Sequence, residues 1–229
     1  VPQFGLNRTF CFSCNNTCLG LALLSLGLFK KVILADTFSP LVAAVFDDAN
    51  VPTLIEAWGA ALAYTFQIYF DFSGYSDMAL GLGRLFNIVL PENFNSPYKA
   101  CSIIDFWRRW HMTLSAFLRD YLYIPLGGSR RGRIRRYVNL MITMLLGGLW
   151  HGAGWTFVLW GGLHGLYLTV NHLWRDAHLP ALPRLFGWVL TFLSVVTGWV
   201  FFRAASLSRA MEILSGMLGR NGIVVPPDY

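Results

Sequence analysis

The sequence is poor in charged residues. Lys, Arg, Asp and Glu make up 13% of its 229 residues, whereas an ordinary soluble domain carries about 25%. Hydrophobic residues make up 55% of the chain and its mean hydropathy is +0.49. This shortage of charge argues against a soluble domain and indicates an integral membrane protein.

Familiar catalytic signatures are absent. The chain has no G-x-S-x-G elbow, no phosphate-binding P-loop and no H-E-x-x-H zinc motif. No segment alternates apolar and polar residues with a period of two, which argues against a membrane β-barrel. The apolar runs therefore predict helices, and the chemistry has to be sought in other residues.

Cysteines number only four. Cys11, Cys14 and Cys18 form a C-x2-C-x3-C cluster, and Cys101 lies alone. A structural metal site normally needs a fourth ligand, and no Cys or His at a familiar spacing supplies one here. We therefore expect reduced thiols and no bound metal.

Five apolar runs are candidates for membrane spans, each of which needs about 20 mostly apolar residues. They cover residues 19–34, 54–70, 137–150, 155–170 and 185–202. Lys30 and Lys31 interrupt the first run late, where they could reach an interface. Residues 78–90 are too short to span and contain Arg84, so we expect a re-entrant or half-buried helix there.

A basic loop accounts for much of the net charge of +6, because residues 130–136 read RRGRIRR. Such a loop most simply anchors the cytoplasmic face of a membrane protein. It could also attract anionic lipid or a nucleotide phosphate. Nucleic-acid binding is disfavoured, because no basic face extends beyond this loop.

His111 follows the tryptophan-rich run WRRW. Ser102 and Asp105 form a capping box that opens a helix. Helical spacing then places an apolar stripe on one face of this helix and arginines on other faces, which predicts an amphipathic helix at a membrane surface. The stripe consists of Trp107, Trp110, His111, Leu114, Phe117 and Leu118.

His151 lies in a run of tryptophans and glycines, GGLWHGAGW at residues 147–155. If a helix runs inward from Arg136, His151 is roughly 22 Å deep at 1.5 Å per residue. Ionisable groups at such a depth usually mark functional sites. A neutral imidazole can serve as a general base, although a histidine packed between helices is an equally good reading of periodicity alone.

The remaining polar candidates have simpler explanations. His164 does not share a helical face with His151, and we expect it to be buried and hydrogen-bonded to a neighbouring helix. His172 and His178 fit an interfacial polar loop. Asp71 and Asp77 could relay protons or bind a cation, but we favour a helix cap for both.

Four blocks in order resemble one family. They read QIYFDFSGYSD at 67–77, LPENFNSPY at 90–98, DFWRRWH at 105–111 with its continuation to 128, and LWHGAGWTF at 149–157 with LHG at 163–165. Together they resemble the membrane-bound O-acyltransferase (MBOAT) family, in its bacterial branch of alginate O-acetyltransferase-like proteins.

The resemblance implies an all-α integral membrane protein, a multi-helix bundle with short re-entrant or interfacial amphipathic helices around a tunnel. It makes His151 the catalytic residue and His111 the second polar position of the active site. No cofactor is expected to be bound, and acetyl-CoA is the expected donor. The expected acceptor is an extracellular polysaccharide such as alginate. The protein itself is expected in the bacterial inner membrane, and periplasmic partner proteins are expected to take part in the transfer.

The resemblance also divides the chain. Residues 1–18 are atypical for the family, residues 19–204 form the expected transmembrane catalytic core, and residues 205–229 are a terminal segment. The chain begins at Val1 rather than Met, so we expect a piece of a longer protein. Two other functions remain open: an acetyl-conducting subunit whose partners do the chemistry, and a structural assembly subunit.

Overall fold

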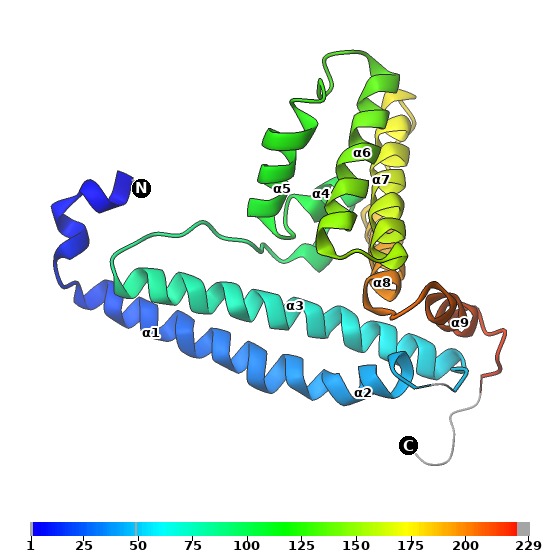
Figure 1. Cartoon of the computed structure of the whole chain (residues 1–229), viewed down its shortest axis with the longest axis horizontal. Coiled ribbons are helices and arrows are strands. Elements are labelled where there is room, and N and C mark those ends of the chain that lie inside the picture. Colours follow the sequence, from blue (N-terminus) through cyan, green and yellow to red (C-terminus); the bar gives the residue numbers. More distant parts are fainter. Residues whose placement is uncertain (1, 49, 224–229) are drawn as a thin grey trace. The chain divides into compact units, whose positions relative to one another are not determined.

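The computed structural model describes residues 2–48 and 50–223, and the regular structure in these two ranges is entirely helical. The chain divides into two compact units, residues 1–40 with 63–93 and residues 41–62 with 94–229. The principal helices, labelled in Figure 1, are α1 (Cys14–Leu28), α2 (Asp36–Phe46), α3 (Leu54–Leu85), α4 (Ile103–Trp107), α5 (Met112–Leu118), α6 (Arg133–His151), α7 (Trp155–Asp176), α8 (Arg184–Arg203) and α9 (Leu207–Met217).

The first unit is built on α1 and the later part of α3, which run side by side (Figure 1). Glycines bring the two backbones into contact at two levels. A Cβ added at Gly74 would lie 2.7 Å from the carbonyl oxygen of Gly27, and one added at Gly81 would lie 2.6 Å from that of Gly20. Small residues at such crossings let apolar helices approach closely, as membrane helices commonly do.

Ion pairs also link α3 to the segment that directly follows α1. A π-helical segment, Phe29–Ala35, carries Lys30 and Lys31. Lys30 binds Asp77 at 2.6 Å, and Lys31 binds Asp71 at 2.7 Å. The expectation that both aspartates cap a helix is therefore wrong, because both lie inside α3, where their carboxylates pair with lysines.

Helix α3 also corrects the predicted break before residue 78. The structure has one helix from Leu54 to Leu85 in place of a span and a separate re-entrant segment. Neither Gly74 nor the two aspartates interrupts it, because the partner helix supplies both the close packing and the opposite charges.

The second unit contains the hairpin of α6 and α7, joined by the short turn 152–154 as the sequence predicted. Glycines again mark the contact: a Cβ at Gly148 would collide with the carbonyl oxygen of Phe157, and one at Gly161 with that of Met144. Helix α8 packs on α7, and α9 packs on α8. Trp58, in the first turns of α3, donates a hydrogen bond to the carbonyl of Met217 at 2.9 Å.

Aromatic rings form the core of this unit where α4, α7 and α8 meet. Buried aromatic side chains each remove about 150–250 Å² from solvent and favour edge-to-face or offset contacts. The rings of Phe106, Trp110, Trp160 and Trp199 are each at most 4% exposed, and Trp107 is 9% exposed.

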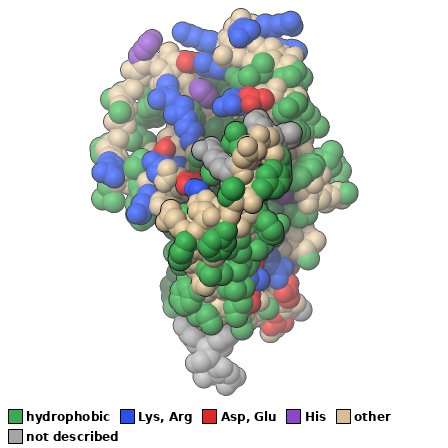
Figure 2. Space-filling view, turned by 90° about the vertical axis from the view of Figure 1, so that its left-hand side faces the viewer, with side chains coloured by type: hydrophobic (Ala, Val, Ile, Leu, Met, Phe, Trp, Pro, Cys, Tyr) green, Lys and Arg blue, Asp and Glu red, His purple; other side chains and the backbone are tan. Residues whose placement is uncertain are grey.

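Two helical stretches of the described residues are long and apolar enough to cross a membrane. They are Cys14–Phe46 and Arg184–Arg203, each with a mean hydropathy of 1.9 over its best window. Apolar side chains also cover much of the face shown in Figure 2. Many large apolar residues are exposed on α1, including Leu21, Leu26 and Leu28, and a lipid environment would cover such faces.

Candidate active site

His111 lies at an elbow between two short helices. Ser102 caps α4 as predicted, accepting a hydrogen bond from the backbone of Asp105 at 3.2 Å. Helix α4 then ends at Trp107, and α5 begins only at Met112. The single amphipathic helix predicted through this region is therefore wrong, because the chain turns at His111.

The backbone of His111 is left-handed, with φ 42° and ψ 59°. This conformation is uncommon for a residue with a side chain, costs of order 1–3 kcal/mol, and persists only where the surroundings impose it. The neighbouring residues supply that constraint. Trp110 stacks on Phe106 with ring centroids 5.7 Å apart, and Arg109 binds Asp105 at 2.8 Å.

His151 is the last residue of α6, followed directly by Gly152 in extended backbone. Its ring is half-buried among aromatic side chains, with centroids 5.2 Å from Trp160 and 5.2 Å from Phe202. Within the described ranges, no side chain or backbone group hydrogen-bonds to this ring. The imidazole therefore keeps its nitrogens available for another molecule.

The structure places His111 and His151 near enough for a charge on one ring to affect the other. Burial, and then the nearby imidazole of His151, lower the pKa of His111 from 6.5 to about 4. A positive charge on either ring disfavours one on the other. His111 is consequently neutral at pH 7, which is the form that can accept a proton or a hydrogen bond.

His164 behaves as the sequence predicted. It is completely buried in the middle of α7, and its Nδ1 accepts a hydrogen bond from the indole N–H of Trp107 at 3.3 Å. Its ring does not face His151 directly, but both rings contact Trp160, at 5.0 Å and 5.2 Å between centroids. His151 and His164 are thus connected through the ring of Trp160.

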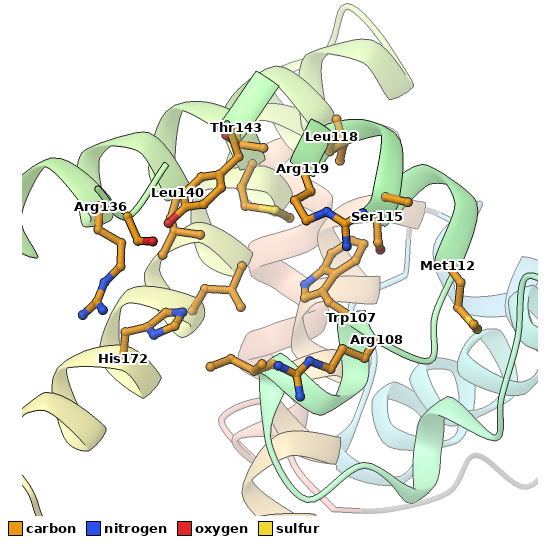
Figure 3. Close-up of a pocket in the computed structure, with 16 residues that line it drawn as sticks. Trp107, Arg108, Met112, Ser115, Leu118, Arg119, Arg136, Leu140, Thr143 and His172 are labelled. Carbon is orange, nitrogen blue, oxygen red and sulfur yellow. The ribbon is translucent and has the colours of Figure 1, made fainter. Parts of the chain in front are cut away.

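A pocket of about 650 Å³ opens beside this cluster, lined by residues of α4 to α7 and the segment between α5 and α6. Figure 3 shows Arg108 and Arg119 on its α4–α5 side, and Arg136 and His172 on its α6–α7 side. The indole of Trp107 forms part of the wall. The rest of the lining is Ile104, Met112, Ser115, Ala116, Leu118, Tyr123, Ser129, Leu140, Thr143, Met144 and Leu168.

Of the basic loop, only Arg136 reaches this pocket. Its guanidinium pairs with Asp176 at the end of α7, and the carboxylate also accepts a hydrogen bond from Tyr137. These two partners hold the pKa of Asp176 below its ordinary value, with the Tyr137 hydroxyl the larger cause. Figure 2 shows further Lys and Arg side chains gathered at the top of the view.

Sequence reasoning missed several pocket residues. Arg108 and Arg119 were assigned only to the polar side of a surface helix, and His172 to a loop. His172 instead lies on α7 and lines the pocket, and burial, followed by the charge of Arg136, lowers its pKa. His178 is exposed in the turn after α7, in agreement with the prediction for it. The chain bends at His111 between α4 and α5, and residues of both helices line the pocket together with residues of α6 and α7; no residue pattern in the sequence predicts this bend.

The cysteines do not join the site. Cys11, Cys14, Cys18 and Cys101 are all free thiols, and the first three are exposed. Across residues 2–48 and 50–223, no three His, Cys, Asp or Glu side chains are grouped closely enough to hold a metal ion.

The known proteins that are similar to this chain include, by their names, two O-acetylating enzymes and an alanyltransferase. The chain is 51% identical to the peptidoglycan O-acetyltransferase of Helicobacter pylori over 227 residues, 97% of this chain and 43% of that protein. It is 51% identical over 191 residues to a protein of Azotobacter vinelandii named "probable alginate O-acetylase AlgI", covering 83% of this chain and 38% of the other. A teichoic acid D-alanyltransferase of Streptococcus thermophilus is 31% identical over 208 residues, 77% of this chain and 49% of that protein.

The chain thus spans less than half the length of these curated relatives. The sequence model of the membrane-bound O-acyltransferase family matches residues 6–209, a range that contains α1 to α8, both histidines of the site and the pocket. The chain belongs to the membrane-bound O-acyltransferase family.

Proposed function

We propose that this chain is the histidine-bearing part of a membrane O-acetyltransferase, with His151 as general base. The observation that carries the proposal is the pairing of two imidazoles at one site, His151 without a hydrogen-bond partner in the described residues and His111 at an imposed elbow. The names of the relatives, which are acetyltransferases and an alanyltransferase of cell-surface polymers, support the same reaction class.

The proposed reaction moves an acetyl group from a thioester to a hydroxyl. As the acceptor oxygen attacks the thioester carbonyl, His151 takes the hydroxyl proton, and the new ester bond forms as the carbon–sulfur bond breaks. The protonated His151 then gives this proton to the leaving thiolate, so that the products are an ester and a free thiol and the base is restored. His111 orients or polarises the reacting groups from the other side of the site.

Acetyl-CoA is the donor we propose, and the pocket supports this choice. Its volume of about 650 Å³ lies in the range of small-molecule sites. Arg108 and Arg119 present cationic side chains that suit the phosphates of a coenzyme A molecule. The basic loop at residues 130–136 would place this pocket on the cytoplasmic side.

The acceptor we propose is a hydroxyl of an extracellular polysaccharide. The chain is equally similar, at 51% identity, to proteins named for peptidoglycan and for alginate, so identity does not choose between these polymers. In our proposal the protein is a multi-pass component of the bacterial inner membrane, with a tunnel that connects the donor side to periplasmic partner proteins.

The rival function is an acetyl-conducting subunit whose partners carry out the transfer. Histidines beside interrupted helices also occur along transport routes. The two functions differ in one observable, because only a transferase subunit releases CoA from acetyl-CoA with a dependence on its own His151.

Acetylation in cells tests the proposal. Full-length protein with His151→Ala is expected to reduce O-acetyl groups on the surface polysaccharide to the level of a deletion strain, because the base is lost. His178→Asn is a control, since His178 is exposed and has a left-handed backbone that Asn tolerates. Acetylation at the wild-type level in the His151→Ala strain would contradict the assignment.

A further inference from the structure

The third histidine of the cluster has a different environment from the two site histidines. His164 is fully buried, and aromatic rings surround it, with Trp160 at 5.0 Å, Trp107 at 5.2 Å and Phe106 at 6.2 Å between centroids. No solvent reaches this ring, and it does not line the pocket. A residue placed in this way does not exchange protons readily with a substrate.

The hydrogen bond to Trp107 fixes the state of the His164 ring. An indole N–H can only donate, so Nδ1 of His164 must be the acceptor, and the proton of the neutral ring lies on Nε2. Nε2 has no partner among the described residues. It lies against Gly198 of α8, where an added Cβ would be 2.8 Å away. Among the residues that the structure describes, the polar contact of the His164 ring is therefore the one with Trp107.

Trp107 is the residue on which this contact acts. It is the last residue of α4, it forms part of the pocket wall, and it precedes the elbow at His111 by four residues. Trp160 provides a second connection, because its ring contacts both His164 and His151.

We propose that His164 is a positioning residue for the acyl transfer. Through Trp107 it fixes the α4–α5 elbow that presents His111, and through Trp160 it fixes the aromatic wall against which His151 packs. This inference rests on the proposed function, since it assigns His164 a part in placing the two histidines of that reaction.

The proposal predicts a loss in turnover and not in donor binding. Displacing a reacting group by about 1 Å can reduce the rate by about 100-fold. Arg136 lines the pocket from α6 and does not belong to the segment that Trp107 positions. Loss of the contact should therefore lower kcat while KM for acetyl-CoA stays nearly constant.

Two substitutions of the full-length protein in membranes test this prediction. His164→Asn can place its Oδ1 where Nδ1 was, and so can still accept the Trp107 N–H. His164→Gln places its polar group near the former Nε2 and leaves Trp107 without an acceptor. We expect His164→Asn to keep kcat within about threefold of wild type, and His164→Gln to lower it at least about tenfold, with KM changed less than about twofold in both.

Trp107→Phe is the reciprocal variant, because it keeps an aromatic ring and removes the donor. We expect it to lower kcat as His164→Gln does. The double variant should be no slower than the slower single variant, because both changes remove one shared contact. Equal activity of the Asn and Gln variants, or an active Gln variant beside an inactive Asn variant, would overturn the proposal.

Hydrogen–deuterium exchange of residues 101–118 separates this inference from the proposed function. Exchange should be faster than in wild type for His164→Gln and unchanged for His164→Asn, whether or not transfer is detected. If the wild-type protein shows no His151-dependent transfer but the exchange pattern holds, the proposed function fails and the positioning contact stands. If exchange is the same in both variants, the positioning contact itself is disproved.

Discussion

Two polar clusters, one in each unit of the chain, differ in how their groups are paired. Between α3 and the π-helical segment that follows α1, the charges are matched: Lys30 binds Asp77 and Lys31 binds Asp71. In the aromatic core of the second unit, the polar groups are neutral and partly unmatched, since Trp160 Nε1 and His164 Nε2 have no partners among the described residues.

This difference separates polar groups that stabilise the fold from polar groups that remain available to a substrate. A paired charge between apolar helices is compensated and has little left to offer a substrate. An imidazole without a partner can still accept a proton or a hydrogen bond. We therefore propose proton acceptance for His151, whose ring has no hydrogen-bond partner among the described residues, and assign a structural role to the lysine–aspartate pairs.

The sharpest test of this contrast is His111→Ala. A positioned acid–base group is worth about 10²–10⁴-fold in rate, and we expect kcat to fall about 100-fold or more. Because Ala is less favourable than His in a left-handed backbone, the substitution also lowers stability, so turnover has to be counted per folded molecule. Turnover per molecule of folded full-length protein in nanodiscs measures the effect. A loss of kcat smaller than about threefold would contradict the assignment of His111 to the active site.

A substitution at the glycine contact between α1 and α3 should lower the thermal stability and leave kcat unchanged. Gly74→Ala places a Cβ 2.7 Å from the carbonyl oxygen of Gly27, and overpacking of this kind costs about 1–3 kcal/mol. Gly59→Ala on the same helix is the matched control, since nothing lies within 4 Å of its added Cβ. We expect the thermal midpoint in detergent to fall for Gly74→Ala only, while the folded fraction keeps its kcat. Equal midpoints would refute the close approach.

The ion pair of Lys30 and Asp77 should contribute less. The two side chains are 21% and 18% exposed, so removing one member costs less than the roughly 3–5 kcal/mol lost when a fully buried pair is broken. Lys30→Ala should lower the thermal midpoint, and the exchanged pair Lys30→Asp with Asp77→Lys should recover most of it. If the exchanged pair is as unstable as the single variant, the interaction is not one of matched charge.

The pocket arginines should give the smallest effect. Arg108→Ala and Arg119→Ala remove cations that we assign to the donor phosphates. Each should raise KM for acetyl-CoA about five- to tenfold and leave kcat nearly unchanged, because this contact is present before and during the reaction. Arg184→Ala, exposed and outside the pocket lining, is the control. Lower kcat at constant KM would mean that these arginines act on the reaction itself.

Local signals in the sequence predicted much of the second unit. The turn 152–154 between α6 and α7 followed from its glycines, and the start of α4 followed from the capping box at Ser102. The burial of His164 followed from its place in an apolar helix. Each of these features depends on residues within a few positions of one another, which is why a single sequence contains the information.

The features that the sequence did not predict depend on distant residues. Helical periodicity continues through His111, so the left-handed turn there arises from the packing of its tryptophan neighbours and not from a turn motif. The sequence around Asp71 and Asp77 resembles a helix cap, and their pairing with Lys31 and Lys30 of the segment after α1 is visible only in the structure. The pocket is lined by residues that lie far apart in the sequence, on α4 to α7. The sequence alone could therefore not place its arginines in one site.

The central claim is that this protein releases CoA from acetyl-CoA through His151. The direct measurement is thiol release by full-length protein in nanodiscs, with His151→Asn compared with His178→Asn, so that both variants carry the same substitution at a histidine. We predict release in wild type and His178→Asn, and loss to background in His151→Asn. Release that persists in His151→Asn at the wild-type rate would contradict the account.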